Sequence, residues 1–392
     1  MQLLFVHDHV FSVDSRGNVY SPGRLPYSSW QRYLDQFPNV RVLARAVSVP
    51  AADNLDLSSG AGVDFIFDHG YSGPRNLILS RPSVVRSIRA AIKRADAIVI
   101  RLPSELGLLA QSIARRCGIP CAVEVVGCAY DAYANYGSLG ARLYAPIAMS
   151  RMKRGVRRAS HAIYVTRTFL QSRYPNCGVT AFASNVQLPA VDDQVFERRI
   201  VRIRELGDSA VLGFMGSLKA DYKGLDVAML SLANMRRRGH EVQLRVLGDG
   251  DATRWRALAE EIGVASFVRF DGVLPAGDPV MRWLDEIDIF LQPSKQEGLP
   301  RSVIEAMSRA IPVLASTTGG IPELLDSECL HRPGDYDVLA RHLHELLTDP
   351  AKMLRQAERN WCEAKAYEAA HVEAVRHAFW QNFSEYVRSG RK

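Results

Sequence analysis

The chain has 392 residues, and 49 Lys and Arg against 42 Asp and Glu give it a formal charge of +7. With 47% hydrophobic residues, it is typical of a folded globular protein and not of a disordered or collagen-like one. No apolar run reaches the ~18 residues that a membrane-spanning helix needs. Six cysteines without a Cys-x-x-Cys pair argue against a zinc ribbon or a disulfide framework.

The first residues lack the basic and apolar regions of a signal peptide, so we expect a cytoplasmic protein. Taken in chain order, short apolar runs alternate with helical patterns, and the helices include 82–94 and 225–238. Such alternation predicts an α/β fold with two doubly wound, Rossmann-like domains facing an interdomain cleft. The runs that we expect to form buried strands are 3–6, 40–44, 97–100, 122–126, 162–165, 211–215, 243–247, 267–270, 287–291 and 312–315.

The boundary between the domains is expected near 190–208, where a loop-like stretch precedes a charged segment. We therefore predict an N-terminal domain at 1–195 and a C-terminal domain at 196–365. The tail at 366–392 is helical in period and rich in aromatic residues, so we expect it to pack on the N-terminal domain. Packing on its own domain is the alternative.

The most informative segment is 292–307. It follows a predicted strand, and a helix is expected to start near Pro300, because proline is favoured in the first helical turn. Glu297 lies in the loop and Glu305 lies in the helix. The free N–H groups at the helix start suit a phosphate, and carboxylates accept hydrogen bonds from sugar hydroxyls. The segment thus indicates a nucleotide-sugar site at the carboxyl end of a parallel strand. The alternative is that either glutamate merely favours the helix dipole.

This segment resembles the Glu-x7-Glu signature of glycosyltransferase family 4, the retaining GT-B enzymes. Four further segments resemble that family's C-terminal domain in the same order: 213–224 with its Lys-Gly turn, 247–250, 268–272, and 312–323 with its Gly-Gly-Ile-Pro-Glu turn. The resemblance is specific over 210–330 and general over 1–190.

The resemblance implies roles for the matching positions. Glu297 and Lys223 would be the catalytic residues. Glu297 would hold hydroxyls of the donor sugar, Lys223 would contact the diphosphate, which leaves with negative charge, and Glu305 would hold the ribose. Asp271, Gly272 and Val273 would border the base. The remaining donor-binding candidates are the backbone N–H groups of Gly298, Leu299 and Arg301, together with Gly216, Ser217, Lys219 and Gly248. We expect no Asp-x-Asp segment to hold a divalent metal against the phosphates, so no metal or other cofactor is expected.

Two positions depart from the family pattern. Ser217 stands where the family usually has an arginine, and Lys219 is a candidate to supply that charge. The N-terminal domain also lacks the family's histidine after the strand at 122–126. Glu124, Asp131 and Arg101 are the candidates to serve in its place.

His7 and His9 alternate after the first strand and would lie on one side of it. We interpret them as candidates for acceptor or donor contact. Ordinary packing of the two side chains is the alternative. A metal site is less favoured than either, because zinc sites need three or four ligands. Gly17 lies in the loop at 15–24, whose composition suits close backbone approach to a substrate.

The charge is unevenly distributed, at +10 over residues 1–200 and −3 over 201–392. Residues 142–158 contain six basic and no acidic residues with apolar residues between them, and 81–94 is a second basic helix. A basic amphipathic helix indicates binding to an anionic membrane surface, and a solvated helix face is the alternative. No nucleic-acid-reading module is present, so nucleic acid is not an expected partner.

These observations predict a metal-independent, retaining hexosyltransferase, peripheral on the cytoplasmic face of the membrane. It would use a UDP- or GDP-linked donor and a lipid-linked or glycan acceptor in surface polysaccharide biosynthesis. The alternatives are a catalytically silent sugar-nucleotide-binding scaffold and a GT-B sugar-nucleotide epimerase.

Overall fold

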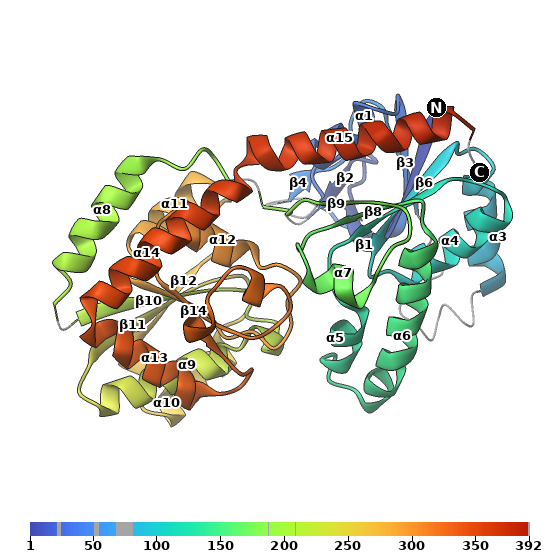
Figure 1. Cartoon of the computed structure of the whole chain (residues 1–392). Coiled ribbons are helices and arrows are strands. Elements are labelled where there is room, and N and C mark those ends of the chain that lie inside the picture. The colour runs from blue at the N-terminus through green and yellow to red at the C-terminus, as the bar shows by residue number, and fades with distance from the viewer. Residues whose placement is uncertain (22–24, 51–54, 68–80, 187, 208, 391–392) are drawn as a thin grey trace. The chain divides into compact units, whose positions relative to one another are not determined.

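The structure is a computed structural model that describes residues 1–21, 25–50, 55–67, 81–186, 188–207 and 209–390 (Figure 1). The chain divides into two compact units. The first comprises Met1–Ala183 with Glu373–Lys392, and the second comprises Ser184–Val372. Each is an α/β domain built around its own sheet.

The first unit has a nine-stranded sheet. Its strands are β1 (Gln2–Val13), β2 (Val19–Ser21), β3 (Asn39–Ser48), β4 (Asp56–Leu57), β5 (Val63–Phe67), β6 (Ala97–Leu102), β7 (Cys121–Val125), β8 (His161–Tyr164) and β9 (Val179–Phe182). Its helices are α1 (Ser28–Leu34), α3 (Arg81–Ile92), α4 (Glu105–Arg116), α5 (Ala129–Ala134), α6 (Leu139–Arg158), α7 (Phe169–Arg173) and α15 (Ala369–Arg388).

Seven of these strands run parallel in the order β5, β3, β1, β6, β7, β8, β9. β2 pairs antiparallel with the end of β1, and β4 pairs antiparallel with β2. The five strands that the sequence predicts in this half are present, and β2, β4, β5 and β9 are additional. Because the carboxyl ends of parallel strands meet at one edge, the loops after β1, β6 and β7 lie together.

The aromatic tail packs on the first unit, as the sequence predicts. Helix α15 places the Trp380 ring 5.0 Å from that of Tyr33, and the Phe383 ring 6.1 Å from that of Phe37. Trp380 and Phe383 are fully buried. The aromatic side chains of the tail, which would be unfavourable in a solvent-exposed segment, therefore complete the core of this unit.

The second unit has a six-stranded sheet in the order β12, β11, β10, β13, β14, β15, and all its strand pairs are parallel. Helices α8 and α14 cover one face and α9 and α13 the other (Figure 1). The strands are β10 (Ser209–Met215), β11 (Glu241–Leu247), β12 (Val268–Gly272), β13 (Ile289–Gln292), β14 (Val313–Ser316) and β15 (Leu330–His331). The helices are α8 (Asp193–Arg204), α9 (Leu225–Arg237), α10 (Thr253–Glu261), α11 (Asp278–Asp285), α12 (Arg301–Ser308), α13 (Tyr336–Thr348) and α14 (Pro350–Ala364).

The units meet at Ala183 and Ser184, earlier in the chain than the expected boundary at 195. The charged segment that follows the expected boundary belongs to helix α8, which buries Val195 and Ile203. Its Arg199 is also buried and donates to the carbonyls of Ile287 and Arg309, at 2.5 and 3.2 Å. These contacts make α8 part of the second unit.

The observed division sharpens the charge asymmetry. The first unit has 26 basic and 13 acidic residues, a balance of +13, and the second has 23 and 29, a balance of −6. The basic excess therefore belongs entirely to the first unit.

Across the described ranges, every helix is too short or too polar to cross a membrane.

Candidate functional site

A lysine–glutamate pair lies at the carboxyl edge of the second sheet. Strands β10 and β13 are neighbours, with Phe214 opposite Leu291, so the loops that follow them lie side by side. Lys223 ends the first loop and Glu297 lies in the second. Lys223 Nζ donates to Glu297 Oε1 at 2.8 Å. The side chain of Glu297 is 8% exposed and that of Lys223 21%. The structure thus brings together the two residues predicted to be catalytic.

A glycine allows these two loops to approach. Gly224 has φ +80°, and a Cβ there would lie 2.2 Å from the carbonyl oxygen of Pro293. Any other residue would strain the backbone and push the loops apart. The Lys-Gly turn therefore sets the position of Lys223 through its glycine.

Three polar residues that the sequence analysis did not single out support Glu297. Ser294 Oγ and Gln292 Nε2 donate to Glu297 Oε1, at 2.8 and 3.1 Å. Ser302 in α12 donates to Gln292 Oε1 at 2.7 Å and fixes the orientation of that amide. Gln292 and Ser294 are fully buried. The only sequence signal for them is their place between the strand and Glu297.

All three hydrogen bonds to the Glu297 carboxylate end on Oε1. No described residue donates to Oε2. The protein therefore fixes one oxygen of this carboxylate and leaves the other available for a ligand.

The Gly-Gly turn of 319–320 packs against the same loop. Gly320 N donates to Gly298 O at 2.7 Å. Gly319 has φ +61°, and a Cβ there would lie 2.2 Å from the carbonyl oxygen of Glu297. The turn after β14 thereby holds the loop after β13 in place.

Helix α12 begins at Arg301 with Pro300 as its N-cap, and no side chain caps its first turn. Among the described residues, nothing accepts a hydrogen bond from the N–H groups of Gly298, Leu299 or Arg301. Free donors at the start of a helix suit an anion such as a diphosphate. They follow Glu297 in the loop after β13, with Lys223 of the neighbouring loop paired to Glu297, and they suit the phosphate-binding role that the sequence predicts for them.

Glu305 lies one turn into this helix. Its carboxylate is 3.7 Å from the Arg301 guanidinium, and the side chain is 15% exposed. Burial raises the pKa of Glu305 above its ordinary value, and the charge of Arg301 opposes this only in part. Glu305 is therefore a partly enclosed carboxyl group whose unused oxygens can accept ligand hydroxyls.

The loops after β10 and β11 meet through two glycines. Gly216 N donates to Leu247 O at 3.0 Å, and a Cβ on Gly248 would lie 1.8 Å from Gly216 O. Ser217 Oγ and Lys219 Nζ both contact Asp249, at 3.4 and 2.9 Å.

Lys219 is highly exposed, so its pair with Asp249 is weakened by solvent. It lies in the same loop as Lys223, yet in the structure its charge faces an aspartate.

The Asp271 carboxylate faces protein groups. It pairs with Arg245 at 2.7 Å and with Arg269 at 2.7 Å, and it accepts from Trp283 Nε1 at 2.7 Å. Its side chain is 7% exposed. In contrast, Val273 is 67% exposed. Within the segment 271–273, the exposed backbone and Val273 can meet a base, whereas the Asp271 carboxylate orders the loop.

Three of the first unit's candidates meet at the carboxyl edge of its sheet. Arg101 and Glu124 are register partners on β6 and β7, and Arg101 Nη1 donates to Glu124 Oε2 at 2.6 Å. Tyr33 donates to the other oxygen, also at 2.6 Å. His7 Nδ1 lies 3.0 Å from Arg101 O.

The Glu124 carboxylate is buried and both its oxygens are occupied. Burial pushes its pKa up, but Arg101, Arg32 and Arg376 outweigh burial and hold it below the ordinary value. A substrate contact by Glu124 stays a prediction, because both of its oxygens face protein groups in this structure. Glu124 positions Arg101, whose side chain is 15% exposed.

His7 is half-buried as a residue, and burial, more than the nearby Arg101 charge, lowers its pKa to about 3.

His7→Gln is expected to flatten the pH dependence of stability between about pH 4 and pH 6. Below pH ~6.5 the unfolded chain binds a proton at His7 and the folded protein does not. Protonation of His7 in the unfolded chain therefore does not affect the free energy of unfolding above pH ~6.5. Below that pH it lowers the free energy of unfolding by up to about 1.4 kcal/mol per pH unit. Denaturant unfolding of both proteins at several pH values measures the slope, and parallel curves would contradict the prediction.

His9 lies on the same side of β1 as His7, with parallel rings 6.4 Å apart. Its Nε2 is 2.9 Å from Ser21 Oγ. Gly17 has φ +84° and closes a turn by donating to Asp14 O at 3.1 Å. Residues 22–24 of the expected loop lie outside the described residues. The structure does not bring Gly17 into a contact with the two histidines.

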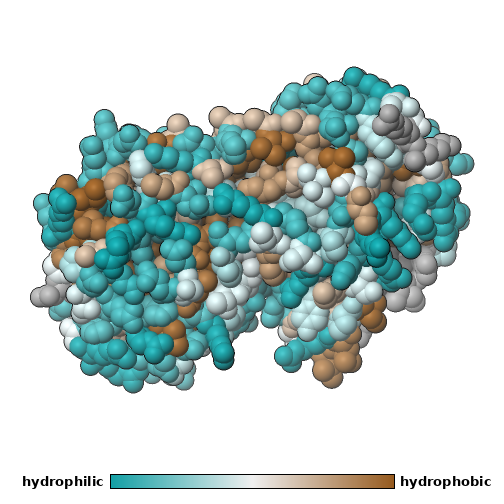
Figure 2. All heavy atoms as spheres, viewed as in Figure 1, coloured by the Kyte–Doolittle hydropathy of each residue, from teal (hydrophilic) through white to brown (hydrophobic). Residues whose placement is uncertain are grey.

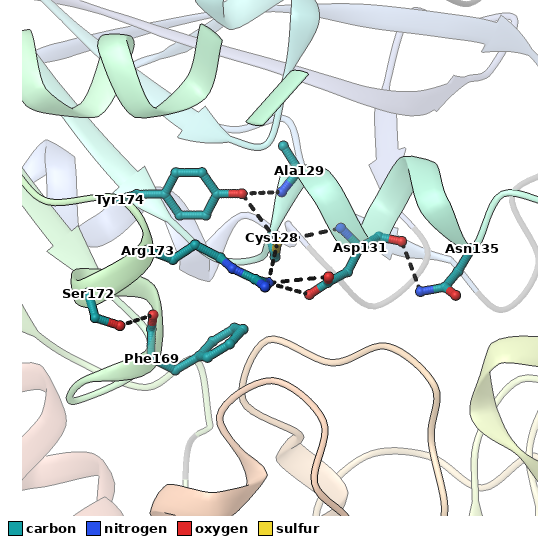
Figure 3. Close-up of polar contacts among 8 residues, drawn as sticks. All are labelled: Cys128, Ala129, Asp131, Asn135, Phe169, Ser172, Arg173 and Tyr174. Atoms are coloured by element: carbon teal, nitrogen blue, oxygen red, sulfur yellow. Dashed lines mark hydrogen bonds and ion pairs between the residues drawn. The ribbon is translucent and has the colours of Figure 1, made fainter. Parts of the chain in front are cut away.

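Asp131 belongs to a separate cluster on the loops after β7 and β8 (Figure 3). Arg173 Nη1 donates to both Asp131 oxygens, at 3.1 and 3.2 Å, and to Cys128 Sγ at 3.1 Å. The Tyr174 hydroxyl lies 3.2 Å from the same sulfur. Phe169 lies 5.1 Å from the guanidinium. No sequence motif joins these residues, and only the adjacency of β7 and β8 could have indicated the cluster.

In the parts of the chain that the structure describes, no group of three or more His, Cys, Asp or Glu side chains is arranged to hold a metal ion.

Comparison with known proteins identifies the family of the second unit. The profile of the family described as "Glycosyl transferases group 1" matches residues 209–349. This range contains the Lys223–Glu297 pair and the start of α12.

Relatives extend the match to the whole chain. Protein CapJ of Staphylococcus aureus is 30% identical over 388 residues, which cover 99% of this chain and 97% of CapJ. The amylovoran biosynthesis glycosyltransferase AmsK of Erwinia amylovora is 34% identical over 134 residues, 32% of this chain and 33% of AmsK.

Solved structures share the two-unit architecture. Sucrose-phosphate synthase from Thermosynechococcus elongatus superposes with a TM-score of 0.68 at 15% identity, over 99% of this chain and 100% of that structure. Anabaena HepE, solved in complex with UDP, gives a TM-score of 0.63 at 17% identity, with the same coverage. Two parallel-sheet α/β units of this kind are the GT-B fold. By its full-length relative, its family profile and its fold, the chain belongs to the GT-B glycosyltransferases.

Proposed function

We propose that this chain is a retaining glycosyltransferase of family 4 that moves a hexose-type sugar from a UDP- or GDP-linked donor to a lipid-linked or glycan acceptor. The Lys223–Glu297 pair beside the free N–H groups of α12 is the observation that carries the proposal. Its ammonium donates to its carboxylate at 2.8 Å, so a cation for the diphosphate and a carboxylate for the sugar lie side by side.

The proposed chemistry follows from the charges that develop in the transition state. Cleavage of the sugar–phosphate bond leaves negative charge on the diphosphate. Lys223 and the N–H groups of Gly298, Leu299 and Arg301 stabilise that charge, without a divalent cation. The free Oε2 of Glu297 accepts hydroxyls of the donor sugar and orients its reacting carbon.

The rest of the donor is assigned along the same edge of the sheet. Glu305 accepts the ribose hydroxyls, and the backbone at Gly272 and Val273 borders the base. Lys219 supplies additional positive charge near the diphosphate, in the role of the arginine replaced by Ser217. In the first unit, Arg101 and His7 contact the acceptor or the donor sugar.

Surface polysaccharide biosynthesis is the proposed setting. AmsK, one of the relatives, is named for amylovoran biosynthesis. Incubation of the purified protein with UDP- and GDP-hexoses tests the activity. Hexose must move to a lipid or glycan acceptor, and consumption of a donor without an acceptor product would contradict the proposal.

We also propose that the protein works on the cytoplasmic face of an anionic membrane, which it contacts through the region 142–158. The structure divides the apolar residues of this helix between two faces. Ala145, Ala148, Met152 and Val156 are buried in the domain. These buried residues are therefore not available to a membrane.

A second set of apolar residues is exposed around the start of α6, where Figure 2 shows hydrophobic atoms at the lower end of α5 and α6. Tyr136, Leu139, Leu143 and Ile147 are 77%, 74%, 71% and 54% exposed. The last three repeat every four residues and form one stripe. Arg142 beside them is exposed. An apolar stripe next to a cation suits the boundary of an anionic bilayer.

The triple variant Leu139→Ser, Leu143→Ser, Ile147→Ser is expected to lose vesicle binding by at least tenfold. Each aliphatic side chain contributes about 1.5–3 kcal/mol on burial. Co-sedimentation with vesicles of phosphatidylglycerol and phosphatidylcholine measures the bound fraction, and pure phosphatidylcholine tests the need for anionic lipid. Val201→Ser, at an exposed aliphatic residue of the second unit, is the control and should bind as the wild type does. Equal binding by the triple variant would contradict the assignment.

A further inference from the structure

A cavity of about 510 Å³ lies in the first unit between helices α4 and α6. Leu108 and Leu109 of α4 and the turn at Ile119 and Pro120 supply apolar walls. Ser112 and Ser160 supply hydroxyl groups. The cavity therefore offers both apolar and hydrogen-bonding surface.

The two helices approach closely at one point, Gly155. A Cβ on Gly155 would lie 2.6 Å from Gln111 Oε1 and 2.7 Å from Leu108 Cδ2. Gln111 Nε2 donates to Gly155 O at 2.9 Å and ties the helices together. The contact at Gly155 makes this wall of the cavity a fixed part of the fold.

Four arginines line the cavity, and they differ in their partners. Arg151 is held by Glu105, whose carboxylate also accepts from Tyr144. Arg115, Arg154 and Arg158 form no ion pair with any residue that the structure describes. Three guanidinium groups from two helices thus line one concave surface, and no described carboxylate neutralises their positive charge. A concave surface focuses such a field and raises the local concentration of anions.

This cavity is separate from the candidate substrate groups. It is lined by Pro120, Cys121 and Ser160, which lie at the amino ends of β7 and β8. Arg101 and Asp131 lie at or beyond the carboxyl ends of β6 and β7. The cavity therefore lies at the opposite edge of this sheet.

We propose that this cavity is a binding site for a phosphate-bearing ligand, held by Arg115, Arg154 and Arg158. Guanidinium groups bind phosphate oxygens through paired N–H donors, and three of them can meet one phosphate or diphosphate. The apolar walls receive an apolar portion of the ligand, such as the glycerol and first acyl carbons of a phospholipid. The site does not depend on the proposed glycosyl transfer.

Helix α6 provides a matched pair of variants. Arg154→Gln with Arg158→Gln removes two charges that line the cavity. Lys153→Gln with Arg157→Gln removes two exposed charges at the same spacing on the same helix, and neither of those residues lines the cavity. Calorimetric titration with inorganic diphosphate compares both double variants with the wild type. Because all three proteins keep the donor site in the second unit, a difference between them reports on the cavity.

The cavity variant is expected to bind diphosphate at least tenfold more weakly than the wild type, whereas the control variant stays within about twofold. Arg115→Gln, on the other helix, should weaken binding in the same way. Equal losses in the two double variants would overturn the proposal, since they would reflect general surface charge. No loss in either would also overturn it.

Dihexanoyl phosphatidic acid, a short-chain soluble phospholipid, is the second probe. If it binds more tightly than diphosphate and still requires Arg154 and Arg158, the ligand is a lipid phosphate. If diphosphate binds more tightly with the same requirement, the ligand is a soluble phosphate. Hexose transfer by the same variants is measured alongside, so that a failure of the cavity and a failure of the proposed enzymatic activity are recognised separately.

Discussion

Glu297→Ala is expected to lower the rate of hexose transfer by about a hundredfold or more while the protein stays folded. Removal of the carboxylate eliminates the oxygen that we assign to the donor sugar. It also leaves Lys223 Nζ, now 2.8 Å from Glu297 Oε1, without its partner. Steady-state transfer with a saturating donor measures the loss.

Two further variants separate chemistry from folding. Glu297→Gln keeps an oxygen that accepts from Ser294 and Gln292, so it should preserve the loop and still lose most of the activity. Glu260→Ala, at an exposed position on α10, should leave the rate unchanged. Wild-type activity in Glu297→Ala would defeat the assignment of the site.

Lys223→Ala is expected to lower kcat by about a hundredfold or more, with a smaller change in KM. Its charge matters most when the diphosphate leaves, so the loss falls on the transition state. The loss should be the same with and without EDTA, because the proposed mechanism places no divalent cation on the diphosphate. Initial rates over a range of donor concentrations separate kcat from KM.

Lys219→Ala is the comparison for this variant. Lys219 is highly exposed and faces Asp249, so its removal should raise the donor KM a fewfold and leave kcat nearly unchanged. A larger effect at Lys219 than at Lys223 would reverse the roles assigned to the two lysines.

The second unit is the part of the molecule that its sequence describes best. Its five predicted strands are present, and Lys223 and Glu297 meet as the order of the motifs implies. The glycines explain this success, because Gly224, Gly248 and Gly319 each occupy a position where a Cβ would collide with a neighbouring carbonyl. The glycine required at such a position can be recognised in the local sequence motif, without knowledge of the distant residues that it contacts.

The first unit is harder to interpret, because its polar groups act through partners far away in the chain. The sequence makes Glu124 a candidate substrate contact, and only the structure shows that Tyr33, 91 residues away, donates to one of its oxygens. Similarly, Arg173 reaches Cys128 and Asp131 across 42 to 45 residues of sequence. No local pattern encodes these pairings.

Helix α6 shows the same limit within one segment. Its sequence reveals apolar residues among basic ones, but only the packing of α6 on its neighbouring helices decides which of them are buried. Met152 and Val156 face the core, whereas Leu143 and Ile147 face solvent. The expected boundary between the units was too late in the chain for a related reason, because the loop before α8 is tied to a distant segment of the second unit. Leu188 O accepts from Ala369 N at 2.8 Å, and Val191 N donates to Glu368 Oε1 at 2.9 Å.

The central claim is retaining transfer of a hexose from a nucleotide donor. Proton NMR of a reaction that contains the purified enzyme, an α-linked UDP- or GDP-hexose and its acceptor tests this claim most directly. We predict that the donor's anomeric signal is replaced by that of an α-glycoside, and only when the acceptor is present. A β-glycoside, or conversion of the donor to another sugar nucleotide without an acceptor, would contradict the account.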